Sequence, residues 1–144
     1  MACLESIQCL IDKKDTSEIV RDQIAQILAN ESENQQALAL RHSLDPTPWK
    51  FDVAVERSNA FEKWLNDQDD LTPIVNVWFD SGTFDKSASD VVKTQKMTGR
   101  YNVDCYACAM AKDIAGGGHE AGDQRSAFEA QRIMRLVRNI LMSS

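Results

Sequence analysis

The chain has few of the residues that mark specialised classes of protein. Its 144 residues include only three prolines, six glycines and two histidines, which excludes collagen-like and low-complexity sequences. No apolar run approaches the roughly 20 residues that a membrane-spanning helix needs. Basic residues number 16 against 22 acidic ones, for a formal net charge of −6. We therefore expect no sequence-specific nucleic-acid binding by the chain as a whole, because phosphate binding needs concentrated positive charge.

The N-terminus also lacks the basic residues that precede the apolar stretch of a signal peptide, and it carries Glu5 instead. We expect the protein to stay in the cytoplasm, without a membrane partner. In that compartment cysteines are usually reduced thiols packed as small hydrophobes, and not disulfides. This expectation covers all four cysteines: Cys3, Cys9, Cys105 and Cys108.

Ordinary composition, 43% apolar and 26% charged, predicts one domain over residues 1–144. Residues 1–48 read as a helical lead-in and residues 49–144 as a sheet with a C-terminal helix. Within the lead-in we expect a helix from Asp15 to Ala29, because Asp15 and Glu18 have the spacing of a capping box. The polar stretch from Asn30 to Gln36 separates it from a weaker helical stretch that ends before two prolines.

Apolar residues then change to the period of strands. We expect a half-buried strand over Phe51–Glu56, a central strand over Ile74–Phe79 and a third over Thr94–Ala109, antiparallel to the second. Ser58 begins a short helix with Phe61 and Trp64. The sequence thus predicts an α+β fold, a small antiparallel sheet with helices packed on one face.

The final helix, expected from Asp123 to Met142, has the strongest helical periodicity. One half of the helix collects its apolar residues: Ala127, Ala130, Ile133, Met134, Leu136, Val137, Ile140 and Leu141. The opposite side carries four arginines, Arg125, Arg132, Arg135 and Arg138, and among them Phe128. An aromatic flanked by arginines on a polar face is typical of a protein interface. Phe128, Arg132 and Arg135 are therefore candidate interface residues.

The segment from Asp80 to Asp90 is predicted to be a long exposed loop. Its carboxylates, Asp80, Asp85 and Asp90, are spaced by five and lack the pattern of a calcium loop. Long polar loops in compact domains are usually functional or disordered. We expect this loop to contact a neighbouring subunit, which makes the three aspartates candidate interface residues too.

The pair Cys105 and Cys108, with His119 downstream, invites a zinc or thiol interpretation. In the strand expected there, residues three apart point to opposite faces and lie roughly 10 Å apart. That distance is too long for a disulfide, and a second ligand pair for zinc is not evident. We predict structural cysteines, and no catalytic, cofactor-binding or metal-binding residue. The glycines Gly116–Gly118 lack the GK[ST] of a phosphate loop and read as a linker.

Four stretches together resemble a known family. They are FDVAVERSNAFEKW (51–64), TPIVNVWFDSGTFD (72–85), QKMTGRYNVDCYACA (95–109) and FEAQRIMRLVRNILM (128–142). The chain resembles tailed-bacteriophage morphogenesis proteins that act at the head–tail junction, as tail terminators or neck components. Family members continue past the last helix into further strand, whereas this sequence stops two residues after Met142.

The resemblance implies a virion structural protein and not an enzyme. It implies a homo-oligomeric ring, usually a hexamer, that is assembled in the host cytoplasm, caps the tail tube and contacts tail-tube and neck proteins. It implies no catalytic residues and no cofactor. Two alternatives stay open: another neck or tail-completion subunit, and a small thiol or metal enzyme using Cys105, Cys108 and His119.

Overall fold

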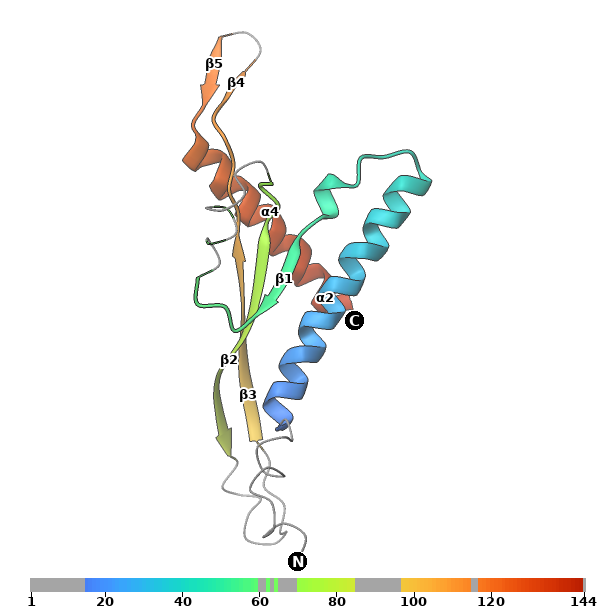
Figure 1. Cartoon of the computed structure of the whole chain (residues 1–144), viewed down its shortest axis with the longest axis vertical. Helices are drawn as coiled ribbons and strands as arrows, with labels where there is room; N and C mark the ends of the chain where they lie inside the picture. The colour runs from blue at the N-terminus through green and yellow to red at the C-terminus, as the bar shows by residue number, and fades with distance from the viewer. Residues whose placement is uncertain are drawn as a thin grey trace, which may run out of the picture.

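A computed structural model describes residues 15–59, 62, 64, 70–84, 97–114 and 117–143. The elements are helix α2 (Thr16–Arg41), the 3-10 helix η1 (Thr47–Trp49), strands β1 (Asp52–Val55), β2 (Ile74–Phe84), β3 (Met97–Tyr106), β4 (Lys112–Ile114) and β5 (Gly118–Glu120), and helix α4 (Gly122–Ser143) (Figure 1). The α+β class predicted from the sequence is confirmed. Of the short helix expected after Ser58, the structure describes Glu62 and Trp64, both helical.

Helix α2 begins where the sequence predicts and ends later. The Asp15 carboxylate accepts hydrogen bonds from the backbone N–H groups of Ser17 and Glu18, and the Glu18 carboxylate accepts from the Asp15 backbone N–H. This completes a capping box. The helix then runs without a break through the polar stretch of residues 30–36. The expected division into two helical stretches is wrong, because that stretch contains no proline or glycine to interrupt the backbone.

The C-terminal end of α2 is a Schellman cap. The Leu44 N–H donates to the Ala39 carbonyl at 2.8 Å, and the Ser43 N–H donates to the Leu40 carbonyl at 3.1 Å. Ser43 has a φ of 57°, in the left-handed region that this cap requires. The chain turns back from this point toward the sheet (Figure 1).

The sheet is mixed, not antiparallel as expected. Its strand order is β1-β2-β3, with β1 parallel and β3 antiparallel to β2. The expected central position of the second strand is therefore confirmed. The error concerns β1: strand direction depends on how the chain between β1 and β2 returns, and periodicity within a strand does not report it.

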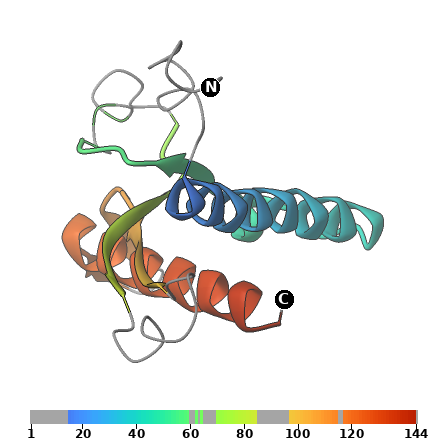
Figure 2. The same ribbon diagram turned by 90° about the horizontal axis from the view of Figure 1, so that it is seen from below.

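Alternation along β2 divides the sheet into two faces. Val75 and Val77 are fully buried, beside Val53 and Cys105 in one row and Val55 and Val103 in the other. Both long helices pack on this face, and the shared core consists of Leu28, Phe51, Val75, Val77, Ile133, Val137 and Ile140. Figure 2 shows α2 and α4 running across the view one beside the other. The expectation that helices pack on one face is confirmed.

Two features at the end of β3 correct the sequence analysis. The strand ends at Tyr106, so Cys108 lies beyond it and not within it. Residues 116–118, expected as a linker, belong in part to a hairpin of β4 and β5 that projects beyond the sheet (Figure 1). Gly117 adopts a φ of 99° at its turn, which favours glycine. Gly117 thus lies in a turn and Gly118 in β5.

The base of this hairpin is fastened to α4. The Ser126 hydroxyl accepts from the Ala109 N–H at 2.9 Å and donates to the Gly122 carbonyl. A Cβ on Gly122 would lie 3.2 Å from the Ala109 carbonyl oxygen, so glycine permits the close approach. The segment after β3 thus holds the first turns of α4 in place.

Candidate subunit interface

The outward face of α4 carries an unusual set of exposed residues. They are Gln124, Ala127, Phe128, Gln131, Met134, Arg135, Arg138, Asn139 and Met142. Their large apolar members are well exposed: Phe128 by 51%, Met134 by 57% and Met142 by 79%. We name these nine residues the α4 outer face. Ala127 and Met134 were expected in the buried arc, but that arc is narrower and centres on Ile133, Val137 and Ile140.

The four arginines of α4 separate into two pairs. The Arg125 guanidinium donates to the Met110 carbonyl at 2.5 Å and lies 3.8 Å from the Glu120 carboxylate. The Arg132 guanidinium donates to the Pro48 carbonyl and pairs with Glu129 at 2.9 Å. These two arginines bind their own chain, which corrects the expectation that Arg132 points freely outward.

Arg135 and Arg138 are exposed, and no ion pair to another described residue involves either of them. The exposed acid of α4, Asp123, lies in its first turn, and the exposed residues from Gln124 to Met142 include no acid. In a chain of net charge −6 this face is therefore locally positive. Aromatic residues, methionine and arginine are enriched at protein interfaces, whereas lysine and the acids are depleted. The α4 outer face has that composition.

The candidate aspartates of residues 80–90 are placed differently from expectation. β2 continues to Phe84, so Asp80 lies in a strand and not in a loop. The register with β3 shifts between Phe79 and Ser81, which leaves Asp80 as an exposed bulge residue without a cross-strand partner. Asp85 and Asp90 lie outside the described residues. The structure does not bring Asp80 together with Phe128.

A second surface lies on the sheet face opposite the helices, and sequence reasoning missed it. Here a hollow of about 290 Å³ is lined by Glu56, Arg57, Ser58, Asn76, Trp78, Asp104 and Tyr106. We name it the Trp78 pocket. Its β2 members alternate with Val75 and Val77, so they point away from the core. The signal in the sequence was the presence of Asn76 and Trp78 within the apolar run Ile74–Phe79.

Hydrogen bonds fix the walls of the Trp78 pocket. The Trp78 indole Nε1–H donates to the Asp104 carboxylate at 2.7 Å. The Asn76 amide donates to the Arg57 carbonyl at 2.8 Å and accepts from the Arg57 N–H at 3.1 Å. Asn76 thereby holds the chain after β1 as a strand neighbour would. These hydrogen bonds hold the pocket in shape, and the one to Asp104 fixes the indole of Trp78.

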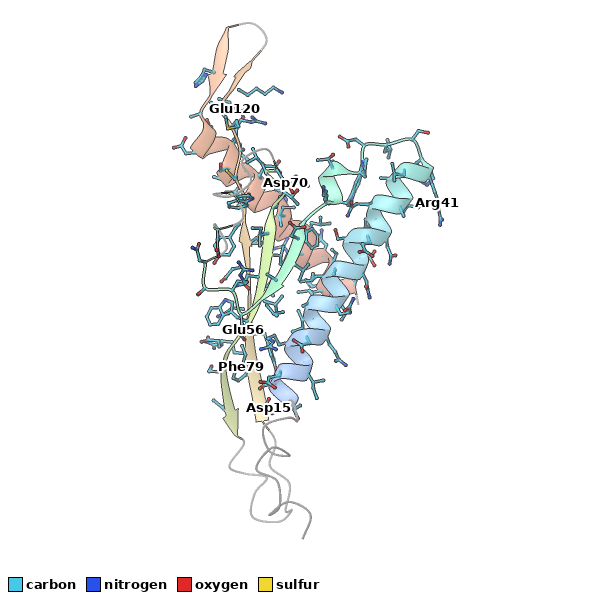
Figure 3. All side chains as sticks on the ribbon, in the orientation of Figure 1. Asp15, Arg41, Glu56, Asp70, Phe79 and Glu120 are labelled. Carbon is cyan, nitrogen blue, oxygen red and sulfur yellow. The ribbon has the colours of Figure 1, made fainter. Side chains whose placement is uncertain are left out.

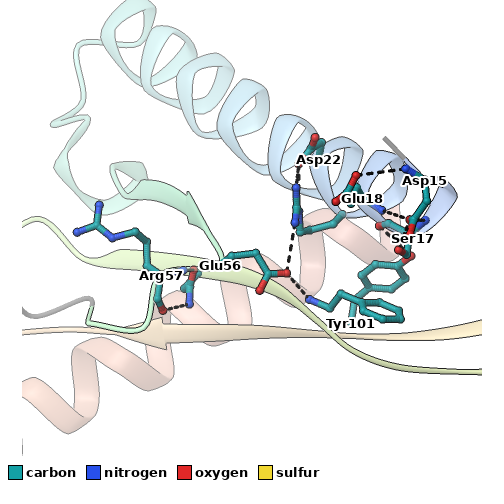
Figure 4. A network of polar contacts seen from close by, with 10 residues as sticks. Asp15, Ser17, Glu18, Asp22, Glu56, Arg57 and Tyr101 are labelled. Atoms are coloured by element: carbon teal, nitrogen blue, oxygen red, sulfur yellow. Dashed lines mark hydrogen bonds and ion pairs between the residues drawn. The ribbon is translucent and has the colours of Figure 1, made fainter. Parts of the chain in front are cut away.

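Glu56, the residue after β1, lines one edge of the pocket. This residue has a φ of 51°, and its carboxylate accepts from the Phe79 N–H at 3.0 Å and lies 3.4 Å from the Arg21 guanidinium (Figure 4). The Arg21 guanidinium also pairs with Asp22 at 2.9 Å. Tyr101 donates from its hydroxyl to the Ser17 carbonyl in the same network. The start of α2 is thus bonded to the end of β1 and to β3, and Glu56 links both to β2.

Charge in and around the pocket is predominantly negative. The pocket lining contains two carboxylates, Glu56 and Asp104, and one guanidinium group, Arg57. Burial, the Asp104 charge and a hydrogen bond to Asp104 together raise the pKa of the Tyr106 hydroxyl. Tyr106 is consequently a neutral donor beside the carboxylate at physiological pH.

The sulfur and imidazole groups of the alternative enzyme hypothesis lie in different environments. Cys105 and Cys108 are free thiols. Cys105 packs against the main core, whereas Cys108 packs against Trp64 and Ile74. Burial, with a smaller contribution from the Asp104 charge, raises the pKa of the Cys105 thiol to about 11. His119 lies in β5, across from Asp113. Among the described residues no three His, Cys, Asp or Glu side chains form a group suited to a metal ion.

Comparisons of the chain with protein-family models, curated proteins and solved structures give no match. Within the parts of the chain that the structure describes, neither helix has the length and apolarity to cross a membrane.

Proposed function

We propose that the protein is a structural subunit of a tailed bacteriophage, acting at the head–tail junction as a ring-forming tail terminator. The observation that supports self-assembly is the α4 outer face, on which Phe128, Met134 and Met142 are exposed. Beside them lie Arg135 and Arg138, which form no ion pair with another described residue. Assignment to the head–tail junction rests on the resemblance of residues 51–142. In this role the work is geometric: a ring of copies caps the tail tube and presents a second surface to the neck.

The exposed apolar side chains of the α4 outer face favour association. Burial of one phenylalanine and two methionines in an interface lowers the free energy by roughly 25 cal/mol per Å² of apolar surface removed from water. Isolated exposed hydrophobes are common, but here they share one helix face with arginines and no acid. Arginine contributes interface hydrogen bonds with limited entropy loss, because its guanidinium is planar. Self-association is the use of this surface that the composition favours.

A neck or tail-completion subunit is the alternative within the same class, since it needs a similar module and differs in its partners. The thiol-enzyme alternative is less well supported. A thiol with a pKa of about 11 is almost wholly protonated at neutral pH, and the thiolate is the nucleophile. Cys105 is therefore a poor candidate nucleophile.

Replacement of the interface anchor tests self-assembly. The double variant Phe128→Ala/Arg135→Glu is expected to remain a folded monomer at concentrations where the parent forms rings. The reason is loss of a desolvated contact, which typically weakens association by ~2 kcal/mol or more. The measurement is native mass spectrometry with electron microscopy, and far-UV circular dichroism checks the fold.

The matched control is Leu40→Ala/Arg41→Glu on α2. Leu40 is 63% exposed, and Arg41 lies at the end of α2 that points away from the sheet (Figure 3). This pair removes an equivalent apolar group and reverses an equivalent charge, and it should assemble as the parent does. A parent that stays monomeric at every concentration would refute the proposed ring.

Location in the virion needs its own experiment. An antibody against the protein, used for immunogold labelling of virions from the phage or induced prophage that encodes it, is expected to mark the junction of head and tail. Labelling confined to the capsid or the distal tail would contradict the tail-terminator assignment. If the protein is present in the lysate but virions carry no label, the proposed structural role is wrong.

A further inference from the structure

We infer that the α4 outer face of one copy docks against the Trp78 pocket of the next copy. This inference rests on the proposed function, since it names the second half of the ring contact. The occupant of the pocket is thus a second copy of this chain, with Phe128 and Arg135 at the centre of the contact.

Charge complementarity supports this pairing. The α4 outer face contributes Arg135 and Arg138, with Asp123 one turn or more away at the start of the helix. The pocket lining, in contrast, contains two carboxylates, Glu56 and Asp104, and one guanidinium group, Arg57. Pairing α4 with itself would instead bring four arginines together, which like-charge repulsion disfavours. A carboxylate has about four acceptor sites, so Asp104 can accept from an incoming guanidinium while it still binds Trp78.

The chemistry of the pocket also suits these side chains. Trp78 and Tyr106 present aromatic surface against which a phenylalanine ring or a guanidinium group stacks favourably. The volume of about 290 Å³ lies at the low end of ligand-binding pockets, which run from ~300 to 1,000 Å³. A hollow of that size accommodates protruding side chains of a partner.

The placement of the two surfaces explains why the contact would produce a ring. α4 packs on one face of the sheet, and its outer face points away from the sheet. The Trp78 pocket opens on the other face of the sheet. Two different surfaces that meet in this way form a head-to-tail contact, which closes into a ring when the rotation between copies permits. A self-complementary contact of α4 alone would stop at a dimer.

The pocket is tested by Ser58→Arg. Ser58 is exposed and lines the pocket, and it takes no part in the Trp78–Asp104 or Asn76–Arg57 hydrogen bonds. The added arginine fills the hollow and opposes the incoming arginines. Self-association is expected to weaken by about 30-fold or more, the equivalent of one lost anchor. The matched control, Asn34→Arg on the exposed side of α2, should associate as the parent does.

Mixing the two broken halves gives the decisive result. Phe128→Ala/Arg135→Glu keeps an intact pocket, and Ser58→Arg keeps an intact α4 outer face. Each alone is expected to be a monomer, whereas their mixture should form one-to-one heterodimers and nothing larger in native mass spectrometry. Circular dichroism and thermal unfolding of each monomer establish that both variants are folded.

Three outcomes would overturn the inference or its basis. Rings formed by Ser58→Arg, with the α4 variant monomeric, would reject the pocket but leave the proposed function standing. A mixture of two folded monomers that gives no heterodimer would reject the pairing of these surfaces. A parent protein that never assembles would instead reject the proposed function itself.

Discussion

The two faces of one three-stranded sheet have opposite chemistry. On the helix-covered face Val75 and Val77 are fully buried within an apolar core. On the open face the intervening residues, Asn76 and Trp78, make hydrogen bonds to Arg57 and Asp104. One strand thus supplies both stability and a patterned surface. The difference teaches that one strand can place alternate side chains in an apolar core and the residues between them in a hydrogen-bonded surface on the other face.

The largest expected effect breaks the covered face. Val77→Asp places a carboxylate where exposure is 0%, and an unpaired buried charge typically costs more than ~4 kcal/mol. Because small domains have a stability of only ~5–15 kcal/mol, we expect a largely unfolded or aggregated protein. Urea unfolding and circular dichroism measure the loss.

The matched variant lies across from Trp78 on the open face. Asn102→Asp adds the same charge at a partly exposed position, and its stability is expected within ~1 kcal/mol of the parent. Equal destabilisation by the two substitutions would mean that the open face is covered as tightly as the core, which would invalidate the comparison.

An intermediate effect is expected from Asn76→Asp, an isosteric change. The carboxylate still accepts from the Arg57 N–H but opposes the Arg57 carbonyl, which the amide donates to at 2.8 Å. Asn76 is only 3% exposed, so we expect a loss of about 2–4 kcal/mol at neutral pH. Burial and the lost donor should raise the pKa of the introduced carboxyl above its unfolded value.

The pH dependence gives the sign of that effect. Folding then favours the protonated acid, so the deficit relative to the parent should shrink as pH falls toward 4. Urea unfolding of variant and parent at several pH values tests this. A deficit that does not change with pH would show that Asn76 acts by shape alone.

The smallest effect concerns Cys105, which lies beside Val75 on the helix-covered face of the sheet. Cys105 has a pKa of about 11, against an ordinary 9.0, so at neutral pH its thiolate fraction is about 100-fold lower than usual. Its alkylation should therefore be slow and should rise about tenfold per pH unit up to that value. Mass spectrometry of peptides from iodoacetamide-treated protein measures the rate, with urea-unfolded protein as the control. Rapid labelling at neutral pH would place Cys105 in a more open site.

Local signals predicted local features well. The Asp15–Glu18 spacing located the start of α2, and the 3.6-residue periodicity located α4 almost to the residue. The end of β2 was missed because Asp80–Phe84 is polar and rich in turn formers, yet pairing with β3 extends the strand through it. Here long-range hydrogen bonds overrode local preference.

The candidate interface was predictable in part. Phe128 and Arg135 were identified from helical angle alone, and both are exposed. Arg132 has the same polar-side angle but binds the Pro48 carbonyl, which lies 84 residues away in sequence. Helical angle states which side of a helix a residue occupies and not which part of the chain meets it there.

By itself, therefore, the sequence determined the starts of α2 and α4, the central position of β2 and the outward side of Phe128 and Arg135, because these features follow from patterns among residues a few positions apart. Only the tertiary structure decided that β1 runs parallel to β2, which arginines are satisfied internally, and that Asn76, Trp78 and Asp104 line one pocket. The physical reason is that these features depend on contacts between distant segments. These contacts form only when the chain folds and brings the distant segments together, so the periodicity of residues along the chain does not predict them.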